Sequence, residues 1–400
     1  MRHSLVLAAI LSVGGHLASI TVASAAQVIT TIATTSAQGG LGMTIPSINN
    51  NGQVAFIDTS PGTNGIYVGA GGPLTTVATS GTLFNQYGAG GGTTLSPDAG
   101  PVINDLGEIA FWANTTGSIS APGILKAQVG SLTTIVTGAA PVGAMGGSAY
   151  SGAPQISNSG TVAFTANRFG GFPGAGVFTG DGGPLTPIIQ TNTETRYPID
   201  PAISNNGTVA YEWTTLGPTG APVADNLYLL HNGITTPIGS TNFGFFTFLA
   251  VNDLGYVAAS SGSQIQMGNG GSFSTVLAAS SEFSHFRTLS LNNLNDLVFD
   301  ALRPTGEHGI YRGPDPVADK VIATGDTLLG ATVMQLAFGR RGFNDHGDVA
   351  FWARLDNGQQ GIFVASVPEP TSISLMLSGA VLVFAAHRRR FFSAGRRTAE

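Results

Sequence analysis

One arrangement of apolar and polar positions recurs along the middle of the chain. Its clearest copy reads Ile103-Asn104-Asp105-Leu106-Gly107-Glu108-Ile109-Ala110-Phe111, in which a short polar turn separates two apolar segments. Copies of this pattern occur at residues 48–56, 103–111, 156–164, 203–211, 251–259, 291–299 and 343–351. Two apolar segments joined by a tight turn that contains Asn or Asp and Gly are typical of a β-hairpin. The sequence therefore predicts one hairpin at each of these places.

The turns share one position that favours a left-handed backbone. Glycine adopts a positive φ without steric cost, and Asn is the other residue that adopts it readily. We expect a positive φ at this position, which is occupied by Gly52, Gly107, Gly160, Gly207, Gly255, Asn295 and Gly347. We therefore expect Gly107→Val to cost more stability than Asp105→Ala, because the Asp side chain would contribute at most one local hydrogen bond.

Two further apolar segments follow each hairpin, except that the seventh copy lacks the fourth segment. In the first copy they are residues 65–68 and 74–78. Residues 28–34, upstream of the first hairpin, are similar to 74–79 and can supply the missing strand. Four strands repeated at a period of about 48 residues are typical of a β-propeller. We predict an all-β fold, a seven-bladed β-propeller with four-stranded blades, in which the N-terminal strand closes the last blade.

The second strand of each hairpin is apolar on both faces. In the first copy Val54 and Phe56 point to one side, and Ala55 and Ile57 point to the other. A sheet packed between two neighbouring blades requires this pattern, whereas a sandwich would show polar alternation.

The repeat resembles a bacterial tandem-repeat family with the consensus Asn-x-x-Gly-x-x-Ala-Phe-x-Ala. Residues 104–113 and 344–353 match the consensus fully, and the other five copies match it in part. The resemblance implies a protein that carries a surface-sorting tail, and it implies no activity.

The first residues are typical of a secretory signal peptide. A basic start with Arg2 precedes an apolar stretch at 5–20, and small residues at 23–26 suit signal peptidase. We expect signal peptide 1–26 and a mature chain that begins near Gln27. An amphipathic first helix is the alternative, although the segment has no polar face.

The last residues read Pro368-Glu369-Pro370, an uncharged run at 371–386, and the basic cluster Arg388, Arg389 and Arg390. This tail resembles the PEP-CTERM sorting signal, which implies recognition by an exosortase in exopolysaccharide-producing bacteria. We expect a propeller at 27–366 and a sorting signal at 367–400 that consists of the motif 368–370, a transmembrane helix 371–386 and a basic tail 387–400. The segment would pass through the inner membrane, after which the protein would reach the cell surface or the medium. An ordinary permanent anchor is the alternative.

Composition and charge exclude several classes of function. The chain has 57 Gly, no Cys and 10% charged residues, so thiol chemistry, disulfides and thiolate metal sites are excluded. Residues 27–367 contain ten Lys and Arg against twenty Asp and Glu. A segment this acidic gains nothing from phosphate neutralisation, so we expect no nucleic-acid partner.

Motifs for catalysis and metal binding are missing from the sequence. The pairs Asn104-Asp105, Asn252-Asp253 and Asn344-Asp345 can be interpreted as cation ligands, but a calcium loop needs further alternate carboxylates. Bonds from these side chains to their own turn backbone are the simpler interpretation. No nucleophile elbow, phosphate-binding loop or paired zinc histidines occur. We predict no catalytic residue, no metal and no cofactor.

The segments that connect one blade to the next are the candidate ligand-binding region. In a propeller these connections cross one end of the ring, where aromatic and Arg side chains can bind sugars. The candidate ligand face consists of Phe84, Tyr87, Arg196, Tyr197, Phe286, Arg287, Arg340 and Arg341. The alternative is that many of these rings fill the interfaces between blades.

These features favour an exported, monomeric binding or matrix protein without enzymatic activity, with extracellular polysaccharide as its ligand. The competing hypothesis is a secreted glycan hydrolase or lyase whose Asp, His or Arg residues converge at one end of the ring. Two carboxylates within about 10 Å of each other at that end would favour the enzyme. An aromatic mouth without carboxylates would favour binding.

Overall fold

The structure, a computed structural model, describes residues 27–36, 43–58, 65–79, 84–87, 100–115, 122–136, 154–166, 175–191, 196–216, 222–241, 248–270 and 273–367. The chain divides into two units, and nearly all the described residues belong to the one that extends from Ile29 to Ala365. The predicted signal peptide 1–26 and the sorting residues Pro368, Glu369, Pro370, Arg388, Arg389 and Arg390 lie outside the described residues. Up to Val367, the part of the chain that the structure describes contains no helix long and apolar enough to cross a membrane.

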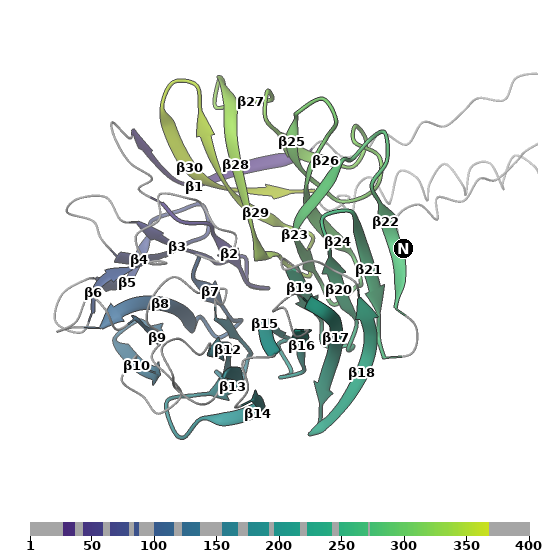
Figure 1. Cartoon of the computed structure of the whole chain (residues 1–400). Coiled ribbons are helices and arrows are strands. Elements are labelled where there is room, and N and C mark those ends of the chain that lie inside the picture. Colours follow the sequence, from purple (N-terminus) through teal and green to yellow (C-terminus); the bar gives the residue numbers. More distant parts are fainter. Residues whose placement is uncertain are drawn as a thin grey trace, which may run out of the picture. The chain divides into compact units, whose positions relative to one another are not determined.

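The described residues form seven β-sheets that are the blades of a propeller, as the sequence predicts (Figure 1). Blade 1 consists of β2 (Ser47–Ile48), β3 (Val54–Asp58), β4 (Gly65–Gly69) and β5 (Thr75–Thr79). Blade 2 consists of β6 (Phe84–Tyr87), β7 (Val102–Ile103), β8 (Ile109–Thr115), β9 (Pro122–Gln128) and β10 (Ser131–Val136). Blade 3 consists of β11 (Gln155–Ile156), β12 (Val162–Ala166), β13 (Ala175–Gly180) and β14 (Thr186–Thr191). Blade 4 consists of β15 (Arg196–Ile203), β16 (Val209–Leu216), β17 (Pro222–His231) and β18 (Ile234–Thr241). Blade 5 consists of β19 (Phe248–Val251), β20 (Val257–Ser260), β21 (Gln264–Gly268) and β22 (Ser274–Ala278). Blade 6 consists of β23 (His285–Leu291), β24 (Leu297–Leu302), β25 (His308–Tyr311) and β26 (Lys320–Ala323).

Blade 7 combines the two ends of the propeller and confirms the predicted closure. Its strands are β1 (Val28–Ser36), β27 (Thr327–Leu328), β28 (Ala331–Phe343), β29 (Val349–Leu355) and β30 (Gln359–Ser366). The order in this sheet is β1-β30-β29-β28-β27, so the N-terminal strand takes the outer place after β30. The inner strands contact one another in the cyclic order β2, β7, β11, β15, β19, β23, β28 and back to β2, which closes the ring.

Each interface between adjacent blades contains its own hydrophobic core. Between blades 7 and 1, Val54 and Phe56 pack with Trp352 and Ile362, whereas Ala55 and Ile57 pack against blade 2. The two faces of the second strand are therefore both buried, as the apolar pattern predicts. Similar clusters occupy the other five interfaces between neighbouring blades. Because each blade has a core on either side, the blades hold one another in place.

The hairpin turns gather at one end of the propeller, which we call the turn end. They consist of residues 49–52, 104–107, 157–160, 204–207, 252–255, 292–295 and 344–347, and in each the fourth residue donates its N–H to the first residue's carbonyl at 3.0–3.2 Å. The shared position has φ between 64° and 90° in all of them, with Asn295 at 64°. The inner strands begin at the other end, which we call the opposite end.

Candidate functional site

In five of the seven turns the first residue is an Asn that joins its own blade to the next. In blade 1, the Asn49 side-chain oxygen accepts hydrogen bonds from the N–H groups of Asn51 and Gln53 at 3.0 and 2.9 Å, which fixes its own turn. Its Nδ2 donates to the Asn104 carbonyl at 2.9 Å. Equivalent bonds run from Asn104 to Ser157, from Asn252 to Asn292, from Asn292 to Asn344 and from Asn344 to Asn49. Bonds from Asn158 N–H to the Asn205 carbonyl and from Asn206 N–H to Asp253 complete the circle.

The second residue of each turn forms a ring of amides and carboxylates, which we call the Asn/Asp ring. In blade order its members are Asn50, Asp105, Asn158, Asn205, Asp253, Asn293 and Asp345. Asp105 accepts from the N–H of Asn50 at 2.8 Å and from the side-chain amides of Asn50, Asn158 and Asn205 at 3.2, 2.8 and 3.2 Å. These donors come from other blades, so the expectation of at most one local bond for Asp105 is wrong.

The other two carboxylates of the Asn/Asp ring are held in the same way. Asp345 accepts from the N–H and the side-chain amide of Asn293 at 2.7 and 2.9 Å. Asp253 accepts from the N–H of Asn206 at 2.7 Å and from the Asn293 amide at 2.9 Å. No group of three or more His, Asp or Glu side chains within the described ranges is arranged to hold a metal ion. The carboxylates therefore serve as acceptors between blades.

A small pocket on the axis lies inside the Asn/Asp ring, and Arg341 lies in its wall. From β28 the Arg341 guanidinium reaches across the axis, where Nη2 donates to the carbonyls of Ile156 and Ile203 at 2.8 Å each. Arg340 donates to the Pro201 carbonyl in blade 4. Burial lowers the pKa of Arg341 below its usual value, while Asp253, Asp105 and Asp345 act in the other direction. Blade 7 is thereby bonded to blades 3 and 4 across the centre of the ring.

The eight residues of the predicted ligand face do not share one end of the ring. Six lie on inner strands: Arg196 and Tyr197 on β15, Phe286 and Arg287 on β23, and Arg340 and Arg341 on β28. Phe84 and Tyr87 lie on β6, which pairs with β8 as the inner strand β7 does. All but Arg340 and Arg341 lie toward the opposite end, because β15 and β23 run from them to the turns and β6 pairs with the end of β8 that is farther from its turn. Arg340 and Arg341 come directly before the turn of blade 7, so the expectation that they join the others is wrong.

Phe286 is a core residue and Arg287 is exposed. The Phe286 side chain is 1% exposed and packs edge-on against Phe299, with ring centroids 5.5 Å apart. Here the alternative interpretation, a ring that fills the interior, is correct. Of Phe84, Tyr87, Arg196 and Tyr197 the structure describes only the backbone.

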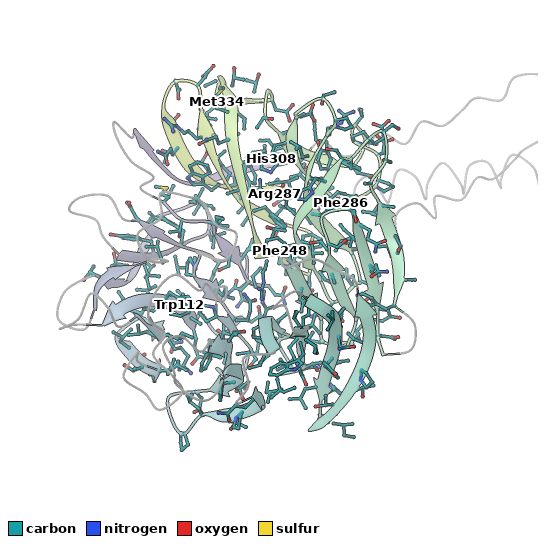
Figure 2. All side chains as sticks on the ribbon, viewed as in Figure 1. Trp112, Phe248, Phe286, Arg287, His308 and Met334 are labelled. Atoms are coloured by element: carbon teal, nitrogen blue, oxygen red, sulfur yellow. The ribbon has the colours of Figure 1, made fainter. Side chains whose placement is uncertain are left out.

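Phe248 was missed by the sequence interpretation. It begins β19, is only half-buried, and pairs with Ser260, whose hydroxyl donates to the Arg287 carbonyl at 2.7 Å. Figure 2 shows Phe248 and Arg287 on the neighbouring blades 5 and 6. An aromatic residue four positions before the first residue of the turn was the available signal, but nothing in the sequence showed that its ring would stay accessible.

Blade 6 contains a buried acidic side chain that contacts a histidine. Asp300, 3% exposed, lies against Nε2 of His308 on the neighbouring strand β25, and His308 is labelled in Figure 2. Asp300 occupies the x of the Ala-Phe-x-Ala segment, a position that is Trp112 or Trp352 in other blades. The two groups satisfy each other at the interface with blade 7.

Comparisons with known proteins agree with the fold and with export. Residues 26–374 match the Family of unknown function (DUF7453), and residues 366–390 match the PEP-CTERM protein-sorting motif. A search of curated proteins found no match. A similar solved structure is the β-propeller domain of the Trilobed protease from Pyrococcus furiosus, at 9% identity over 83% of this chain and 97% of that chain, with a TM-score of 0.50.

Two less similar structures are enzymes. A gluconolactonase from Xanthomonas campestris shares 11% identity over 84% of this chain and 89% of that chain, with a TM-score of 0.37. The α-L-arabinanase of Penicillium chrysogenum, complexed with arabinobiose, shares 13% identity over 70% of this chain and 94% of that chain, with a TM-score of 0.41.

Proposed function

The chain belongs to the Family of unknown function (DUF7453) and carries the PEP-CTERM protein-sorting motif, and we propose that this exported β-propeller is a non-enzymatic binding or structural protein whose ligand is extracellular polysaccharide. One observation supports the absence of catalysis most directly. The three carboxylates of the Asn/Asp ring are each held by donors from neighbouring blades. A general base needs an oxygen within reach of a substrate proton, whereas these oxygens are already used to join blades.

The opposite end supports the choice of ligand. Phe248 and Arg287 come from adjacent inner strands and are linked through Ser260. Aromatic rings stack on sugar faces and Arg donates hydrogen bonds to hydroxyl and carboxylate groups. An exported protein meets such polymers outside the cell. We place the first polysaccharide contacts at these two residues, with Arg196 and Tyr197 of the neighbouring blade 4 as further candidates.

Export would proceed through both predicted terminal segments. In this proposal signal peptidase removes residues 1–26, and an exosortase recognises Pro368-Glu369-Pro370 together with the basic cluster at 388–390. The match of residues 366–390 to the sorting motif supports the second step. The remaining chain, close to 27–366, would act as a monomeric propeller at the cell surface or in the medium.

A binding assay with a measurement of chain length tests this function. The mature protein is incubated with exopolysaccharide of the producing bacterium, and we expect retention of the protein with no change in polymer length. Arg287→Ala and Phe248→Ala should each weaken retention by about fivefold, which corresponds to about 1 kcal/mol. Val276→Ala, on the outer strand β22, is the matched control and should bind normally. Shortening of the polymer would replace the proposal with the hydrolase or lyase, and absence of retention would remove the ligand.

A further inference from the structure

Aliphatic side chains project from the turn end at equivalent positions of three blades. Leu106, Leu254 and Leu294 each occupy the third position of their turn and are 63%, 61% and 58% exposed. Each donates its backbone N–H to the side-chain oxygen of the first Asn of the turn at 3.0–3.1 Å. The turn is thus rigid while the Leu side chain stays outside the core. Repetition at one register position distinguishes these residues from scattered surface leucines, which need no explanation.

The turns between third and fourth strands add apolar residues to the same end. Val129 follows β9 and is 65% exposed, and Ile234 begins β18 and is 69% exposed. Gln128, beside Val129, donates to the Leu106 carbonyl at 3.0 Å, which places that turn next to the hairpin turn of blade 2. His231 bonds the Thr208 hydroxyl at 2.6 Å and does the same in blade 4. The apolar tips of blades 2, 4, 5 and 6 therefore lie at the same end of the propeller as the Asn/Asp ring.

Strand β30 also ends at the turn end. Ala365 pairs with Val349, which begins β29 shortly after the turn of blade 7. Arg312 donates to the carbonyls of both Gly347 and Ala365, so the end of β30 lies beside that turn. The residues matched by the sorting motif begin at 366. The uncharged run starts at Thr371, and the five residues 366–370 span at most about 17 Å when fully extended.

We propose that the turn end rests on the lipid surface, with its aliphatic tips in the interface, for as long as the C-terminal segment is inserted in the membrane. A connection of at most about 17 Å keeps this end near the headgroups. The transfer of Leu and Ile side chains from water to the acyl boundary of the membrane lowers the free energy. The acidic propeller disfavours anionic lipid, so the surface it fits is zwitterionic. This inference rests on the sorting motif and is independent of polysaccharide binding, and it leaves the opposite end facing away from the membrane.

The absence of cysteine makes the proposal directly testable. Leu254→Cys and Leu294→Cys are introduced separately into the mature full-length chain and labelled with a polarity-sensitive fluorophore. Met334→Cys is the matched control, because Met334 is 57% exposed but lies near the start of β28 at the opposite end. The labelled chains are reconstituted into phosphatidylcholine vesicles, and their melting temperatures before reconstitution confirm that they fold.

We expect blue-shifted emission, quenching by nitroxide lipids and protection from aqueous iodide at positions 254 and 294, and none of these at 334. Equal iodide quenching at all three positions would overturn the proposal. If the two turn labels stay exposed in vesicles but become protected only in membranes from exporting cells, the turn end meets a membrane protein instead of lipid. That result also overturns the proposal.

Discussion

Replacing Asp105 tests the Asn/Asp ring as a structural element. One carboxylate oxygen accepts the Asn50 N–H at 2.8 Å, and the other accepts the Asn158 amide at 2.8 Å with two longer bonds at 3.2 Å. A net contribution of about 1–1.5 kcal/mol for each of the two shorter bonds gives a loss of about 2–3 kcal/mol for Asp105→Ala. Strain at a positive φ costs about 1–3 kcal/mol, and Gly107 has φ of 77°. Asp105→Ala and Gly107→Val should therefore destabilise the propeller by similar amounts, because the two ranges overlap.

Urea unfolding of the mature chain measures both losses. Asp181→Ala is the matched control, because Asp181 is exposed and accepts one bond from Gly183 in its own turn at 3.1 Å. The control should change the free energy of unfolding by less than about 0.5 kcal/mol. The loss for Asp105→Asn should lie between the losses for Asp181→Ala and Asp105→Ala. The amide keeps one acceptor oxygen, but its NH₂ group faces the donors that the carboxylate accepted from. A loss for Asp105→Ala as small as that for Asp181→Ala would refute the argument that the ring stabilises the fold.

Four further outcomes follow from the structure. Arg341→Met leaves two inner-strand carbonyls without their donor and should lower the free energy of unfolding in urea by about 2–3 kcal/mol. Arg341→Lys should lose less than Arg341→Met but should not reach the stability of the native chain, because an ammonium lacks the planar fork of the guanidinium. An unchanged unfolding midpoint for Arg341→Met would contradict a stabilising role of the Arg341 bonds across the axis. Phe286→Ala should cost about 3–5 kcal/mol, because the ring is 1% exposed, whereas a shift of under 1 kcal/mol would place the ring outside the core. Deletion of residues 28–36 exposes the edge of β30 and should cause aggregation detectable by light scattering; a soluble variant with unchanged melting would argue against closure by β1. Replacing Pro368, Glu369 and Pro370 with Ala should keep the uncleaved protein in the membrane fraction, and normal release would show that the motif is not recognised.

Several features of the fold follow from short-range sequence patterns. Two apolar segments around a polar turn within nine residues, such as 103–111, identify the hairpins, and the repeated Gly or Asn identifies the turn residue with positive φ. These patterns are local because a turn conformation and the two faces of a strand depend on neighbouring residues only. The repeat period then determines the number of blades, and the unpaired segment at 28–34 identifies the strand that closes blade 7.

The tertiary structure alone decided what the polar and aromatic residues contact. Arg341 bonds carbonyls 185 and 138 residues away, and Asp105 binds amides from three other blades. Such partners depend on the curvature of the ring, which no short segment encodes. Phe286 and Arg287 are adjacent in sequence, yet one is core and one is exposed. The sequence interpretation assigned the residues of β6, β15 and β23 to the connections between blades, whereas the structure has them in strands. The length of a strand depends on its partner, and here β8, β16 and β24 extend far enough to pair with these residues. The repeat pattern therefore determined the scaffold, and the closure of the ring determined which side chains remain free to act.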